Sequence, residues 1–141
     1  MRASLNLTIK GKWFDMIASG AKREEYRDCE HPQVERFWLW TINADHWGYR
    51  RHFAVFRNGY SMDSRALAVE IVGIGLRGKG EVKHPEWGEP RGNRLHIAIE
   101  LGRVLKVCDS YRALKEWIDN SSDLRGWVNR ANSANETEGR T

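Results

Sequence analysis

Cysteine is scarce in this sequence, with only two in 141 residues, and this scarcity excludes several kinds of site. Cys29 and Cys108 lie far apart and belong to no Cys-x-x-Cys pair, so we expect neither a zinc knuckle nor a disulfide framework. The five histidines show neither a His-Glu-x-x-His motif nor close paired spacing. We therefore predict two reduced, part-buried thiols, no metal site and no cofactor.

Long apolar runs are also missing. No stretch approaches the roughly 18 to 20 consecutive apolar residues that span a bilayer. Residues 1–10 lack the apolar segment and the small-residue cleavage site of a secretory signal. The sequence therefore predicts a cytoplasmic protein that does not enter a membrane. Its length is that of one domain with a single hydrophobic core.

Positive charge and aromatic rings, in contrast, are plentiful. The formal net charge is +4, and the chain holds seven tryptophans. Cations bind phosphates and flat rings stack on bases, so this balance favours a nucleic-acid partner. Tryptophans are, however, common in protein cores, and composition alone leaves the partner open. We assign the following aromatic residues mainly to the core: Trp13, Phe14, Phe37, Trp38, Trp40 and Trp117.

The N-terminal part of the chain combines strand and helix patterns. Residues 5–9 alternate apolar with polar side chains, as a half-buried strand does. Apolar residues recur at helical spacing from Trp13, and Gly20 follows where a left-handed residue ends a helix. Residues 23–28 carry charges around a tyrosine, which favours a polar strand. Residues 34–38 show helical spacing again.

Strands dominate the middle of the predicted chain, at residues 53–56, 66–76, 95–101 and 104–107. Asn58-Gly59 is the signature of a tight two-residue turn after the first of these strands. Glycines bend the second strand, and Gly102 permits a turn or bulge between the last two. Residues 77–91 are rich in glycine, proline and charge, and we expect a long exposed loop there.

One further helix is predicted over residues 111–118, with Asp109 or Ser110 as its N-cap. The order of elements predicts an α+β fold, a small bent-sheet β-barrel with short helices packed around it. This domain covers residues 1–108. Residues 109–141 form the C-terminal helix and a tail that we expect to be disordered.

A cluster of charged residues lies where the first helix gives way to the polar strand. Glu25 and Arg27 are two apart and share one face of that strand, while Lys22 lies at the mouth of the turn. A lysine that is partly desolvated has a lowered pKa and suits general-base chemistry, and an arginine offers a planar fork for a phosphate or carbonyl oxygen. The alternative is a surface ion-pair ladder on an edge strand, each pair contributing about 0 to 1 kcal/mol.

The same residues resemble a known family. A helix followed by Gly-x-Lys-x-x-Glu-x-Arg is similar to the signature of the ASCH domain, and its four positions are Gly20, Lys22, Glu25 and Arg27. Later segments resemble blocks of ASCH proteins common in phages and prophages, at residues 57–60, 69–74, 85–88 and 96–102. The resemblance covers roughly residues 5 to 107.

The resemblance implies a PUA-like β-barrel with a cleft that is lined by the motif and binds RNA or a nucleotide. Some small bacterial members are amidohydrolases that deacylate acetylated cytidine, and others are described as cutting RNA. In the amidohydrolase branch a threonine nucleophile stands where this chain has Glu25. Without that hydroxyl, Lys22 and Glu25 would have to activate a water instead.

Other residues have both a functional and a structural interpretation. Asn58 could bind a base edge and Tyr60 could stack on it, or the two could shape a hairpin and pack. Trp87 could fold over a ligand or onto the core. His84 and Glu86 could add an imidazole or a carboxylate to the cleft.

Four arginines could form a phosphate track beside Trp47, or could be ordinary solvated charge; they are Arg36, Arg50, Arg51 and Arg57. The leading prediction is a protein that binds RNA or a modified nucleotide. The alternatives are a metal-independent hydrolase, either a ribonuclease or an N4-acetylcytidine-type amidohydrolase, and a protein-interaction module that uses the tail from Asn120 onward.

Overall fold

The computed structural model describes residues 4–28, 52–77, 85–88 and 96–121. These parts of the chain form five strands, two α-helices and one short 3-10 helix. In chain order they are β1 (Ser4–Thr8), α1 (Gly11–Ala18), β2 (Glu24–Asp28), β3 (His52–Arg57), β4 (Ala66–Arg77), η2 (Pro85–Trp87), β5 (His96–Cys108) and α3 (Tyr111–Asn120).

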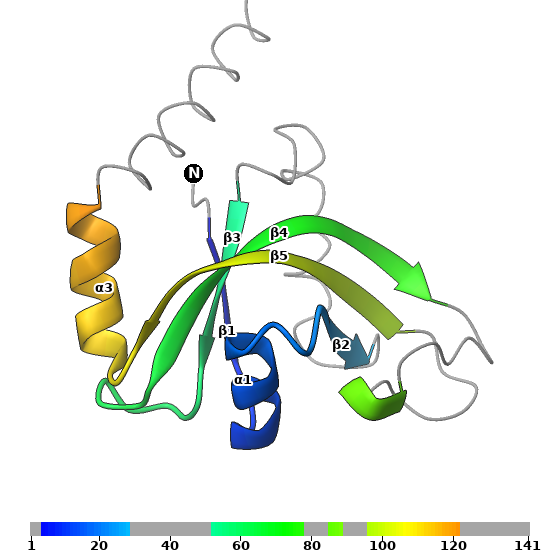
Figure 1. Cartoon of the computed structure of the whole chain (residues 1–141), viewed down its shortest axis with the longest axis horizontal. Helices are drawn as coiled ribbons and strands as arrows, with labels where there is room; N and C mark the ends of the chain where they lie inside the picture. Colours follow the sequence, from blue (N-terminus) through cyan, green and yellow to red (C-terminus); the bar gives the residue numbers. More distant parts are fainter. Residues whose placement is uncertain (1–3, 29–51, 78–84, 89–95, 122–141) are drawn as a thin grey trace, which may run out of the picture.

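The five strands form one curled, mixed sheet in the order β1-β3-β4-β5-β2. β1 runs parallel to β3, and the other neighbours are antiparallel. Figure 1 shows β4 and β5 arching over α1 and β2, so that the sheet is a half-barrel. The predicted α+β class and bent sheet are confirmed at this level. Within the described residues the curl stays open, because β1 and β2 form its two edges.

The bend arises in the long pair β4–β5. The register between these strands shifts three times between Ala68 and Gly73, as irregular pairing or bulges do when they add twist. The sequence predicted a bent strand here and was right. It also predicted two strands separated at Gly102, and this was wrong, because β5 runs without interruption from His96 to Cys108. The irregular pairing with β4 absorbs the change of direction.

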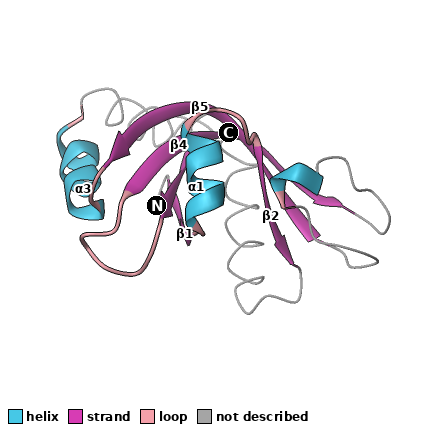
Figure 2. Ribbon diagram, turned by 60° about the horizontal axis from the view of Figure 1, so that its bottom comes forward, coloured by secondary structure: helices cyan, strands magenta, loops and turns pink. Residues whose placement is uncertain are grey.

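Each face of the sheet has its own apolar cluster. Side chains alternate between the two faces along β3 and β4, so Phe56 and Leu67 contact the cluster around α1, whereas Val55 and Ala68 contact the cluster around α3. Both helices are therefore needed to bury the sheet, and Figure 2 shows them at separate places along it. Leu114 is fully buried in the α3 cluster.

Two connections differ from the predicted ones. Arg57 pairs with Ala66, so residues 58–65 form an eight-residue loop instead of a two-residue turn. The Asn58 side chain explains this, because it donates to the Ile9 carbonyl and accepts from Arg65 Nε, which ties the loop to the β1–α1 junction. Residues 85–87 of the predicted exposed loop form the 3-10 helix η2.

Several predictions concern residues that the structure does not describe: the helix at 34–38, the thiol of Cys29 and the tail beyond residue 121. Cys108 is a free, partly buried thiol, and burial raises its pKa. Among the described residues, no helix is long and apolar enough to cross a membrane.

The N-cap of α3 gives a test of the fold. Ser110 Oγ accepts from the Ala113 amide at 3.1 Å, which selects Ser110 over Asp109 as the cap. We expect Ser110→Ala to lower the free energy of unfolding by about 1 kcal/mol. Asp109→Ala is the matched control and should change it by less than about 0.5 kcal/mol. Urea denaturation measures both, and equal effects would contradict this cap.

Candidate functional site

The site lies at the connection between the end of α1 and β2, an edge strand of the sheet. α1 stops at Ala18, and Gly20 adopts a left-handed φ of +82°, as the sequence predicted. The Lys22 amide donates to the Met16 carbonyl at 3.0 Å, which fixes the start of the next segment against the helix. β2 then pairs with β5, with Glu25 opposite Ile99. The polar strand is thus fixed against α1 just before its start and against β5 along its length.

Glu25 links two cations through its two oxygens. Its Oε1 lies 3.3 Å from Lys22 Nζ, and its Oε2 accepts from Arg27 Nη2 at 2.9 Å. The side chains of Lys22, Glu25 and Arg27 are only 1%, 7% and 16% exposed. The alternative of a surface ion-pair ladder is therefore wrong, because this ionic triad is buried. Arg27 Nη2 also donates to the Thr8 carbonyl at 2.7 Å, which connects the two edges of the open sheet.

Lys22 lies in an apolar and aromatic environment. Its ammonium lies 5.1 Å from the centroid of the Trp13 ring and 4.9 Å from that of Tyr26, and it donates to the Trp87 carbonyl. Burial lowers the pKa of Lys22, and the nearby Glu25 carboxylate opposes this shift. The sequence expectation of a desolvated lysine beside a carboxylate agrees with this geometry.

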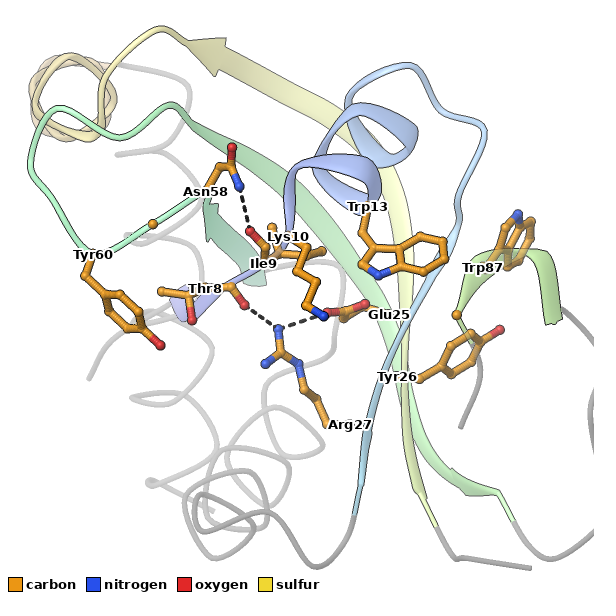
Figure 3. Close-up of a pocket in the computed structure, with 12 residues that line it drawn as sticks. Thr8, Ile9, Lys10, Trp13, Glu25, Tyr26, Arg27, Asn58, Tyr60 and Trp87 are labelled. Carbon is orange, nitrogen blue, oxygen red and sulfur yellow. Dashed lines mark hydrogen bonds and ion pairs between the residues drawn. The ribbon is translucent and has the colours of Figure 1, made fainter. Parts of the chain in front are cut away.

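A cleft of about 580 Å³ opens beside the triad. Glu25, Tyr26 and Arg27 of β2 line it on one side, and Lys10, between β1 and α1, lines it with Asn58 of the 58–65 loop (Figure 3). Figure 3 also shows aromatic rings on both sides of the polar groups. Lys22 pairs with Glu25 but is not itself part of the lining of this cleft. A ligand in the cleft would therefore meet Glu25 and Arg27 directly.

Trp13 and Trp87 form one wall of this cleft. The sequence assigned Trp13 mainly to the core, and it does pack against the α1 cluster, but it also lines the cleft. Gly88 has a φ of +80°, and a Cβ there would lie 2.7 Å from Trp13 Cζ2. The chain after η2 can approach Trp13 this closely only because residue 88 is glycine.

Asn58 and Tyr60, which had both a functional and a structural interpretation, line the cleft. The Asn58 amide is already used within the fold, as described above. Tyr60 is 87% exposed, so its ring does not pack as the structural interpretation required. Arg57 donates from Nη2 to the carbonyls of Tyr60 and Ser61, each at 2.9 Å, and stacks on the Tyr111 ring. Arg57 thus stabilises the 58–65 loop through its backbone carbonyls.

The structure brings only part of the predicted set together. Trp87 lies beside the triad, and Glu86 is exposed and does not line the cleft. The remaining candidates lie outside the described residues; they are Arg36, Trp47, Arg50, Arg51 and His84.

Sequence reasoning missed Thr8, Ile9 and Lys10 as lining residues. Their position at the end of the first strand and directly after it was the one available signal, since ligand sites gather at strand ends and the loops that follow them.

Comparison with known proteins adds no relative: no protein-family model, curated protein or solved structure matches the chain. In the described part of the chain, no group of three metal-ligating side chains comes together.

The lowered pKa of Lys22 predicts a pH-dependent contribution to stability. Between that lowered value and the ordinary 10.5, the unfolded chain binds more protons at this residue than the folded chain does. The free energy of unfolding of the wild type, relative to Lys22→Met, should therefore rise with pH in this window, by at most about 1.4 kcal/mol per pH unit. Below this pH range Lys22 is protonated in both states, so the full cost of burying its charge reduces the stability of the folded chain. Denaturation from about pH 7 upward checks this, and a flat or falling difference would contradict it.

Proposed function

We propose that the chain is an ASCH-like protein of the phage and prophage type, with a PUA-like half-barrel, that binds RNA or a modified nucleotide in the cleft. The observation that carries this proposal is the buried triad of Lys22, Glu25 and Arg27 directly beside a cleft walled by aromatic rings. The charged triad, the aromatic rings and the size of the cleft each suit a different part of such a ligand.

Burial of the triad is costly for a merely structural role. Moving three charged groups out of water carries a desolvation penalty, and apolar residues of similar volume often stabilise a fold as well or better. Perturbed titratable groups at the side of a cleft mark functional sites more often than other places. The burial of Lys22 and Glu25 therefore supports a role in binding or chemistry.

The charge of the site suits an anionic ligand. Lys10 and Arg27 line the cleft together with Glu25, the one carboxylate of the lining, and Lys22 pairs with that carboxylate. Glu25 is neutralised by its two partners, so the excess charge at the surface is positive. Phosphate oxygens are the matching groups in a nucleotide, and an arginine fork binds them with defined geometry.

The walls suit a base. Trp13, Tyr26, Tyr60 and Trp87 all line the cleft, and aromatic rings stack on bases of single-stranded RNA. The volume of about 580 Å³ falls within the range of roughly 300 to 1,000 Å³ that small-ligand sites occupy. A nucleotide therefore fits the cleft in charge, surface and size.

A hydrolase is the second candidate, and the lowered pKa of Lys22 favours it. In this version Lys22 and Glu25 together take a proton from a water or a ribose 2′-hydroxyl. Arg27 then stabilises the charge that develops on the oxyanion or phosphate. The third alternative, an interaction module that uses the tail, rests on residues outside the described part of the chain.

One paired experiment tests binding and hydrolysis together. Wild type, Lys22→Met and Lys12→Met are each titrated with a mixed-sequence single-stranded RNA at several salt concentrations. We expect the affinity of the wild type to fall with salt, and Lys22→Met to lose about tenfold or more, since it removes a charged hydrogen-bond partner of Glu25. Lys12 is the matched control, because it also lies over the Trp13 ring, at 4.7 Å, but is not one of the two cations of the buried triad that pair with Glu25.

The same three proteins are then incubated with N4-acetylcytidine and with the RNA, and products are followed by chromatography and mass. A product that wild type makes and Lys22→Met does not, with unchanged circular dichroism, assigns the hydrolase. Binding without product assigns the binding protein. Neither binding nor product in the wild type would overturn the proposed function.

A further inference from the structure

The aromatic residues of the cleft form two separate groups. Figure 3 shows Trp13, Tyr26 and Trp87 together on one side, and Tyr60 alone on the other. They come from different parts of the fold, the first group from α1, β2 and η2 and the second from the loop between β3 and β4. One flat ring system bound at the first group would leave the Tyr60 side of the cleft empty.

Tyr60 is presented to solvent by a loop that is held firmly. Arg57 fixes the Tyr60 and Ser61 carbonyls, and the Arg65 guanidinium donates to the Asn58 side chain at 3.1 Å. The Asn58 amide also donates to the Ile9 carbonyl at 2.9 Å. The backbone on either side of Tyr60 is thus anchored, while its ring is 87% exposed. An anchored, exposed ring at the rim of a cleft is well suited to stack on a flat ligand group.

Cationic and polar groups lie between the two aromatic groups. In Figure 3, Lys10, Thr8 and Arg27 occupy the space between Tyr60 and Trp13. Both hydrogen bonds that Arg27 makes within the described residues come from Nη2, which leaves Nη1 available to a ligand. Lys10 is exposed and lines the cleft. The order across the cleft is therefore ring, cation, ring.

We infer that the cleft takes two consecutive nucleotides of a single RNA strand, one base at the Trp13–Trp87 side, the next against Tyr60, and their linking phosphate at Lys10 and Arg27. This inference rests on the proposed function and specifies its ligand. The alternation of bases and phosphates along a single strand matches the alternation of rings and cations. A free nucleoside would use one aromatic group and leave the cations without an anionic partner.

Calorimetric titration of the full chain tests this. The ligands are the four ribonucleoside 5′-monophosphates and the four matching homodinucleotides. A second stacked base contributes about 1 to 3 kcal/mol, so the best dinucleotide should bind the wild type about tenfold or more tightly than its mononucleotide. In Tyr60→Ala this ratio should fall to about one. In Trp87→Ala both ligands should bind more weakly, and the ratio should persist.

Met62→Ala is the matched control, because Met62 is exposed in the same loop but does not line the cleft; it should keep the wild-type ratio. Equal affinity of the wild type for the two ligand lengths, or a ratio that Tyr60→Ala leaves intact, would overturn the two-nucleotide inference while nucleotide binding stands. Failure of the wild type to bind any of the eight ligands or the mixed-sequence RNA would overturn the proposed function together with the inference.

Discussion

The Glu25 carboxylate, shared between Lys22 and Arg27, joins parts of the chain that are far apart in sequence. Through Lys22 it reaches the Trp87 carbonyl of η2, and through Arg27 it reaches the Thr8 carbonyl of β1. The buried Glu25 carboxylate is therefore connected, through its two partners, to η2 and to β1, which both contribute to the lining of the cleft. Removing one partner of such a buried pair costs about 3 to 5 kcal/mol, because a charge is left uncompensated.

The same arrangement determines what the cleft can do. Glu25 is one carboxylate beside three cations, Lys10, Lys22 and Arg27, and this imbalance gives the site its positive character. The Trp13 and Tyr26 rings lie next to the Lys22 ammonium and help to exclude water from it. The same two rings line the cleft, so the residues that desolvate the lysine also make the cleft aromatic. Binding and catalytic interpretations share this physical origin, and they differ only in whether a bond of the ligand is broken.

Local patterns were sufficient for much of this structure. Period-two alternation located β1, helical spacing and Gly20 located α1 with its end, and two-residue spacing placed Glu25 and Arg27 on one face. Burial of the triad could not be predicted, since it depends on η2 approaching Lys22 from 65 residues further along the chain.

Long-range contacts explain the other differences as well. The 58–65 loop replaced a tight turn because the Asn58 side chain bonds to Ile9, 49 residues earlier. Lys10 lines the cleft because β1 pairs in parallel with β3, a pairing that no local pattern specifies.

The most direct measurement of the central claim is to titrate the mixed-sequence single-stranded RNA into the isotope-labelled full chain and follow amide chemical shifts. The account predicts that the largest changes fall on β2, residues 85–88 and residues 58–60; largest changes on α3, away from the cleft, would contradict it.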